Sequence, residues 1–150
     1  SQGRTVDFKN TIIIMTSNLG SEYILNKDIN SNDLVMEELR HTFKPEFINR
    51  IDEIIIFNSL DKDTLYNILD NIIKNIEDRL SNMHIKISLS ESAKKHIIDN
   101  SYDERYGARP IKRYVSKNIE SLLANNIIED TISFGQNIII DIENNKFIIK

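Results

Sequence analysis

The sequence predicts an α/β fold in two parts. Residues 1–59 are expected to form the end of a larger α/β domain, and residues 60–150 a self-contained α+β lobe. Short apolar runs at 11–16 and 51–57, with helical patterns between them, are typical of strands buried on both faces of a parallel sheet. Beyond Leu60 the apolar residues recur mainly at helical spacing, and two later segments predict a small sheet.

In the first part, the strand expected at 11–16 ends abruptly at Ser17 and Asn18. Gly20 then predicts a turn before a short helix. A second helix should end before Pro45, because the residue before a proline disfavours the helical conformation. Its apolar stripe consists of Leu34, Met36, Leu39 and Phe43.

The second part begins with a helix of about five turns, for which Asp61 or Asp63 is the expected cap. Its stripe consists of Leu65, Ile68, Leu69, Ile72, Ile73, Ile76 and Leu80. Residues 85–89 alternate between apolar and polar side chains and predict a half-buried strand. Ser90 is expected to cap the next helix, which should end near Asp99.

Residues 102–107 are expected to be a linker, after which Pro110 should open a long helix. The stripe of this helix consists of Ile111, Tyr114, Val115, Ile119, Leu122, Leu123 and Ile127. Residues 138–142 and 147–149, on either side of two asparagines, predict a closing β-hairpin.

Composition excludes several classes of function. The formal charge of −4 disfavours binding to nucleic acid or to an anionic membrane, since both require a positive surface. The chain has no cysteine, which excludes disulfides, zinc–thiolate sites and a cysteine nucleophile. Neither an apolar segment of roughly 20 residues nor a signal peptide is visible, so a secreted or membrane-spanning protein is not expected.

No catalytic motif accompanies the α/β pattern. The four glycines are too far apart for a phosphate-binding loop, and no metal-binding spacing of acidic residues occurs. His41, His84 and His96 are isolated and are interpreted as surface histidines. We therefore expect neither a metal site nor an independent active site within these residues.

Three polar residues nevertheless stand out. Asn18 follows an apolar run, at the strand end where open α/β sheets bind ligands, although a turn or cap role is the more common one for an asparagine. Arg50 precedes the second apolar run. An exposed charge or a pair with Asp52 would contribute under about 1 kcal/mol and would not explain its position.

Arg109, in "YGARPIKR", is the third of these residues. Pro110 favours the first helical position, so Arg109 should stand where the long helix begins, after a sharp turn at Gly107. Free N–H groups and the helix dipole favour an anion at such an end. The alternative is a surface arginine paired with Asp103 or Glu104.

Three segments together resemble the second ATPase module of the Clp-type, hundred-kilodalton heat-shock AAA+ unfoldases. They are "GRTVDFKNTIIIMTSNLGS" (3–21), "FKPEFINRIDEIIIF" (43–57) and "YGARPIKR" (106–113). The resemblance covers essentially the whole chain. "FINRIDE" and "NIESLLANNII" are most similar to the disaggregase members of the family, with the protease-partnered members second.

The resemblance implies a role for each of the three residues. Asn18 matches the sensor-one position, which orients the hydrolytic water near the γ-phosphate. Arg50 matches the arginine finger, which reaches the ATP of the neighbouring subunit in a hexameric ring. Arg109 matches the sensor-two arginine, which, with Gly107 and Ala108 in the "GAR" motif, contacts the nucleotide of its own subunit.

For the longer protein, the resemblance implies a disaggregase or unfoldase driven by ATP and Mg²⁺. Residues 1–59 would end the large AAA+ subdomain and 60–150 would be the small one, with a hinge at 58–61. The Walker A and B motifs are expected before Ser1, so the chain alone is expected to be an inactive oligomerisation module. Unfolded or aggregated clients, a co-chaperone or a Clp protease are the expected partners, in the cytoplasm or the matrix of a plastid or mitochondrion.

Overall fold

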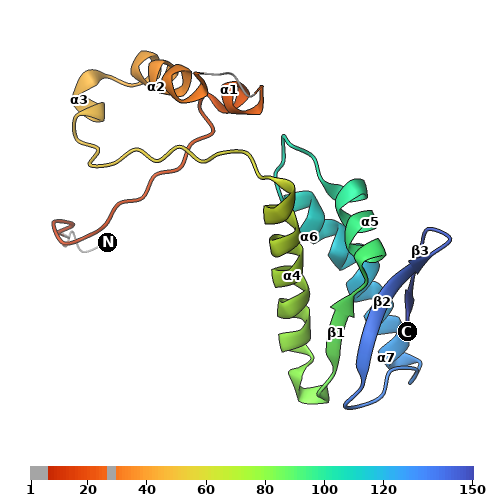
Figure 1. Cartoon of the computed structure of the whole chain (residues 1–150). Helices are drawn as coiled ribbons and strands as arrows, with labels where there is room; N and C mark the ends of the chain where they lie inside the picture. Colours follow the sequence, from red (N-terminus) through yellow and green to blue (C-terminus); the bar gives the residue numbers. More distant parts are fainter. Residues whose placement is uncertain (1–6, 27–29) are drawn as a thin grey trace. The chain divides into compact units, whose positions relative to one another are not determined.

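The structure is a computed structural model that describes residues 7–26 and 30–150. It divides into two units, one ending at Ile56 and the other comprising Phe57–Lys150 (Figure 1). The first unit contains short helices, whereas the second combines helices with a three-stranded sheet.

The first unit contains α1 (Ser21–Leu25), α2 (Ser31–Thr42) and α3 (Pro45–Ile48). α1 packs against α2, where Val35 is 7% exposed. Gly20 begins the turn into α1 with φ of 67°, and a Cβ there would lie 2.9 Å from Cγ2 of Val35. The position therefore requires glycine both for its left-handed conformation and for close packing.

The two strands predicted in this part of the chain are not formed. Residues 11–16 and 51–57 carry no strand pairing, and most of their side chains are exposed, including Ile12 at 92% and Phe57 at 82%. A strand is stable only when its N–H and C=O groups meet a neighbouring strand. The described residues provide no such neighbour for either segment, so both strand predictions are wrong for this structure.

The second unit begins as predicted with a long helix, α4 (Lys62–Arg79). The Asp61 carboxylate caps it by accepting a hydrogen bond from the Thr64 backbone N–H at 2.7 Å. β1 (Lys86–Leu89) follows, and Ser90 then caps α5 (Glu91–Ser101) by accepting from the Ala93 N–H at 3.1 Å. Both predicted caps are confirmed.

The predicted long helix is continuous but contains a π-helical turn. It consists of α6 (Arg109–Val115), the π-turn η2 (Ser116–Glu120) and α7 (Ser121–Ile128). Its most buried residues are Ile111, Val115, Ile119 and Leu123. Because these lie four apart, an α-helix of about 3.6 residues per turn would rotate each by roughly 40° relative to the last. The wider turn at η2 offsets this rotation and keeps the four side chains on one face.

The sheet has the order β1–β2–β3, with β2 (Asn137–Glu143) and β3 (Lys146–Ile149) forming the predicted hairpin. β1 pairs with β2 in parallel, with Ile87 opposite Ile138, and β2 pairs with β3 antiparallel. Helix α4 protects the free edge of β1, since the Glu77 carboxylate accepts from the Ile87 N–H at 3.0 Å.

One apolar core joins the helices and the sheet of the second unit. Its buried residues include Leu65, Leu69, Ile73, Ile97, Ile111, Val115, Ile119, Ile138 and Ile140. Helix α4 and the long helix contribute to it through the stripes that the sequence predicted, and α5 and the hairpin add further apolar residues. The α+β lobe is thus confirmed.

Asp141 holds the start of α5 to the sheet and to the end of the chain. Its carboxylate accepts hydrogen bonds from Ser90 Oγ at 2.5 Å, Ser92 Oγ at 2.8 Å and Lys150 Nζ at 2.7 Å. The Lys150 ammonium, followed by the two serine hydroxyls and the Ile142 N–H, lowers the pKa of Asp141 far below its ordinary value.

A lowered pKa makes the contribution of Asp141 dependent on pH. The carboxylate stabilises the fold above the unfolded-state pKa of about 3.9 and loses this effect as the pH falls below it. We predict that the free energy of unfolding, measured with urea, falls less between about pH 5 and pH 2 in Asp141→Asn than in the wild type. Lys150→Ala should show a smaller reduction of this fall. Identical pH profiles for the wild type and Asp141→Asn would contradict the assignment.

Candidate functional site

Asn18 lies in the turn between the extended segment and α1. Its backbone carbonyl accepts from the Ser21 N–H at 3.2 Å, while Ser17 Oγ accepts from the Leu19 N–H at 3.1 Å. The cap of α1 is Gly20 rather than Asn18. The backbone of Asn18 therefore makes the turn, and its exposed side-chain amide is not used as a helix cap.

Arg50 lies in a turn that directly follows α3. Pro45 starts this helix at its first position, and the rings of Phe43 and Phe47 stack at 5.1 Å between centroids. The Arg50 N–H donates to the Phe47 carbonyl at 3.1 Å, which closes the turn. The guanidinium is exposed and has no ion pair with Asp52 among the described residues, so that alternative is not supported.

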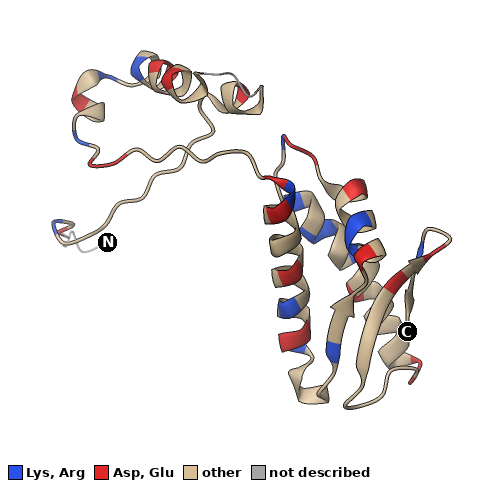
Figure 2. Cartoon of the chain, in the orientation of Figure 1, with Lys and Arg blue, Asp and Glu red and all other residues tan. Residues whose placement is uncertain are grey.

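Arg109 is the first residue of α6, so the helix begins one residue before Pro110, which was expected to open it, and the Arg109 side chain is exposed. Asp103 pairs with Arg105 instead of Arg109, with Nη2 of Arg105 3.0 Å from Oδ2. Helix α6 also carries Lys112 and Arg113 and has no acidic residue in its first turn (Figure 2). The basic residues of α6 therefore add positive charge near Arg109, which favours an anionic ligand.

The other two residues of the "GAR" motif shape the backbone before Arg109. Gly107 has φ of 62° in the left-handed region, which confirms the predicted sharp turn. Ala108 precedes α6 as its N-cap, and its carbonyl accepts from the Ile111 N–H at 3.1 Å. Since Ile111 is fully buried, the start of α6 is fixed to the core.

The predicted site residues come from both units. Asn18 and Arg50 belong to the first unit and Arg109 to the second. The described residues contain no group of three or more His, Asp or Glu that could hold a metal ion. Nor does any described helix have the length and apolar character to cross a membrane.

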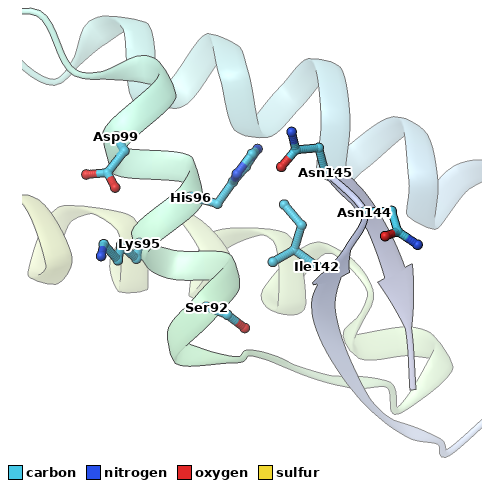
Figure 3. A pocket seen from close by; sticks show the side chains of 7 residues that line it. All are labelled: Ser92, Lys95, His96, Asp99, Ile142, Asn144 and Asn145. Atoms are coloured by element: carbon cyan, nitrogen blue, oxygen red, sulfur yellow. The ribbon is translucent and has the colours of Figure 1, made fainter.

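An open hollow of about 680 Å³ lies between α5 and the β2–β3 hairpin (Figure 3). Its lining residues are Ser92, Lys95, His96, Asp99, Ile142, Asn144 and Asn145. His96 is half-buried, and its ring meets that of Phe147 at 5.5 Å between centroids. His96 thus keeps part of its surface exposed, and its aromatic contact with Phe147 was not expected from the sequence. None of the predicted site residues lines the hollow.

Two family models match the chain in succession. Residues 60–140 match the family described as the C-terminal, D2-small domain of ClpB protein. Residues 1–54 match the AAA domain of the Cdc48 subfamily. The ClpB match alone covers more than half of the chain. The chain belongs to the Clp family of AAA proteins, with a ClpB-type D2-small domain.

Curated relatives agree with this assignment. The chaperone protein ClpB of Bacillus cereus is 45% identical over 99% of the chain, and that of Aquifex aeolicus is 44% identical over 99%. The negative regulator of genetic competence ClpC/MecB of Bacillus subtilis is 42% identical over 100% of the chain. The chain spans 18%, 16% and 20% of these three proteins, respectively.

The left-handed turn at Gly107 gives a direct test of the local geometry. A Cβ at this position would meet no atom within 4 Å, so Gly107→Ala should cause no steric clash. The substitution should destabilise the fold only because alanine disfavours the left-handed backbone conformation. We predict a loss of roughly 1–2 kcal/mol in the free energy of unfolding, measured by urea titration. Gly107→Asn should lose less, because asparagine tolerates this conformation better. Equal stability of the alanine variant and wild type would contradict the prediction.

Proposed function

We propose that the chain is the C-terminal part of an ATP-driven, hexameric protein disaggregase of the ClpB type. The observation that carries the proposal is the similarity to ClpB chaperones over 99% of the chain, which includes all three motifs. In this proposal residues 1–59 end the large AAA+ subdomain and residues 60–150 form the small one. Unfolded or aggregated proteins are the proposed clients.

Arg50 is proposed to act as the arginine finger on the ATP of a neighbouring subunit. Its guanidinium is exposed and is not engaged in an ion pair with the described residues, so it is available to a group outside the chain. Guanidinium groups remain charged at all relevant pH values and bind phosphate through two parallel hydrogen bonds. An arginine supplied in this way contributes roughly 10³–10⁵ to the rate of phosphoryl transfer.

Arg109 and Asn18 are proposed to act on the nucleotide of their own subunit. Arg109 would contact the phosphates from the small subdomain, where Lys112 and Arg113 add to the positive field. The Asn18 amide, which makes no helix cap, would orient the attacking water. These side chains fit the phosphate end of ATP. No Mg²⁺ ligand is assigned to this chain, because its described residues contain no acidic cluster.

A second proposal is a ClpC-type ATPase that serves a Clp protease. It is favoured by the 42% identity to ClpC/MecB, only slightly below the identity to ClpB.

For the isolated chain, a non-catalytic role in oligomerisation is proposed. The exposed apolar side chains of Ile12, Ile13 and Ile14 favour it, since such surface is usually covered by a partner.

The arginine-finger proposal predicts a separation of binding from hydrolysis. In the full-length protein, Arg50→Ala should retain nucleotide binding and lose ATPase activity by roughly 10³-fold or more. Arg40→Ala, another exposed arginine of the same unit, is the matched control and should hydrolyse ATP normally. Wild-type turnover in Arg50→Ala would refute the finger assignment.

Mixed rings test whether Arg50 acts between subunits. Arg50→Ala subunits and Walker-deficient subunits should each be inactive alone. When they are mixed, some interfaces pair an intact finger with an intact nucleotide site and should recover measurable ATPase activity. No recovery from rings that demonstrably mix would contradict action in trans.

The sensor-two proposal predicts that Arg109→Ala weakens ATP binding, or its coupling to hydrolysis, in the full-length protein. We expect an increase of roughly tenfold in Kd or KM, corresponding to the loss of one charged hydrogen-bonding partner. Arg113→Ala on the same helix controls for a general loss of positive field. Equal effects of the two variants, or an unchanged Arg109→Ala, would contradict a specific contact.

A further inference from the structure

The loop Asp103–Gly107 joins α5 to α6 and leads through Ala108 to Arg109 (Figure 1). We propose that Asp103 is a positioning residue that closes this loop and thereby sets the place from which Arg109 reaches the nucleotide. The inference rests on the proposed role of Arg109. It gives Asp103 a role other than that of an ion-pair partner of Arg109.

Asp103 contacts three of the four residues that follow it. Its Oδ1 accepts from the Arg105 backbone N–H at 2.9 Å and from Arg105 Nε at 3.2 Å, and Oδ2 accepts from Nη2 at 3.0 Å. Its backbone carbonyl accepts from the Tyr106 N–H at 3.0 Å. An antiparallel bridge joins it to Gly107. The side-chain bonds to Arg105 and the backbone contacts to Tyr106 and Gly107 together fold the chain back on itself immediately before the left-handed turn.

Both ends of the loop are attached to the core. On the α5 side, the Tyr102 N–H donates to the Ile98 carbonyl at 3.0 Å, and the half-buried Tyr102 ring packs against the core. On the α6 side, the fully buried Ile111 fixes the first turn. Between these points the Asp103 carboxylate adds side-chain hydrogen bonds to Arg105 that help to close the segment. Removing the carboxylate should therefore make the loop between Asp103 and Arg109 less ordered without disturbing the core.

Asp103 also makes the two nearby arginines chemically different. Its carboxylate is hydrogen-bonded by the Arg105 side chain and backbone, which lower the pKa of Asp103 and keep it ionised at neutral pH. The Arg105 guanidinium lies 5.6 Å from the centre of the Tyr106 ring. Arg105 is thus held by a carboxylate and an aromatic ring, whereas Arg109 has neither partner among the described residues.

A set of variants in the full-length protein separates these contacts. Asp103→Ala removes the acceptor for both the backbone and the side chain of Arg105. Asp103→Asn keeps an oxygen for the Arg105 backbone N–H and loses the ion pair, while Arg105→Ala keeps the backbone hydrogen bond alone. We expect Asp103→Ala to raise the KM for ATP roughly threefold to tenfold, and the other two variants to stay within about twofold of wild type. Asp99→Ala on α5 is the matched control and should have no effect.

A double variant tests whether Asp103 acts through Arg109. If it does, Asp103→Ala should weaken ATP binding in the wild-type background and add nothing once Arg109→Ala is present. A residue that only stabilised the fold would instead lower Tm in both backgrounds and would leave ATP affinity unchanged at temperatures where the protein is folded. Rescue of ATP affinity by Asp103→Asn is the additional result that a purely structural role would not produce.

The outcomes distinguish this inference from the function on which it rests. If Arg109→Ala impairs ATP binding and Asp103→Ala does not, or if their effects multiply, the positioning role is overturned and the sensor role remains. If Asp103→Asn is as impaired as Asp103→Ala, the charge and not the loop geometry is required, which also overturns the inference. If Arg109→Ala binds ATP normally, the proposed function of Arg109 and the role of Asp103 are both refuted.

Discussion

Burial of one face of the helix from Arg109 to Ile128 is the constraint on which the second unit depends. Ile111, Val115, Ile119 and Leu123 are between 0% and 2% exposed and pack within one core. Each side chain of this kind contributes roughly 1.5–3 kcal/mol when fully buried. Because four of them lie on one continuous helix, its first turn cannot shift without disturbing the core. Packing therefore fixes the helix from Ile111 onward, while the contacts of Asp103 close the loop that leads to the exposed Arg109.

The first unit is organised differently. Among its described residues, Val35 is the one side chain classed as buried, and two apolar segments remain exposed. The turn at Arg50 is closed by local hydrogen bonds after a four-residue helix. Local hydrogen bonds of this kind define the direction of the backbone. They bury little apolar surface around Arg50 and therefore do not hold its side chain in one position. A finger that acts on another subunit would depend on the interface for its final position.

Polar contacts in the second unit fix the ends of its elements. Asp61 and Ser90 cap helices, Glu77 covers the edge of the sheet, and Asp141 joins α5 to the hairpin. No buried side-chain polar atom among the described residues lacks a partner. Asp103 performs a similar task in a loop, where the same kind of carboxylate hydrogen bond defines the approach to a candidate nucleotide-binding residue.

The sequence by itself determined the helices, caps and turns that depend on residues close together in the chain. The stripe from Leu65 to Leu80 predicted α4, Ser90 and Asp61 predicted caps, and Gly107 predicted a left-handed turn, because periodicity and backbone preference act over a few residues. The three motifs predicted the family, which the similarity to ClpB confirmed.

Tertiary structure decided what depends on partners distant in the chain. Residues 11–16 and 51–57 have the composition of strands, but a strand exists only when another strand accepts its hydrogen bonds. The contact between His96 and Phe147 and the π-turn at Ser116–Glu120 likewise arise from packing between elements. The ion pair of Asp103 with Arg105 is a local contact, but the sequence could not decide between it and a pair with Arg109, because both arginines lie close to Asp103 in the chain.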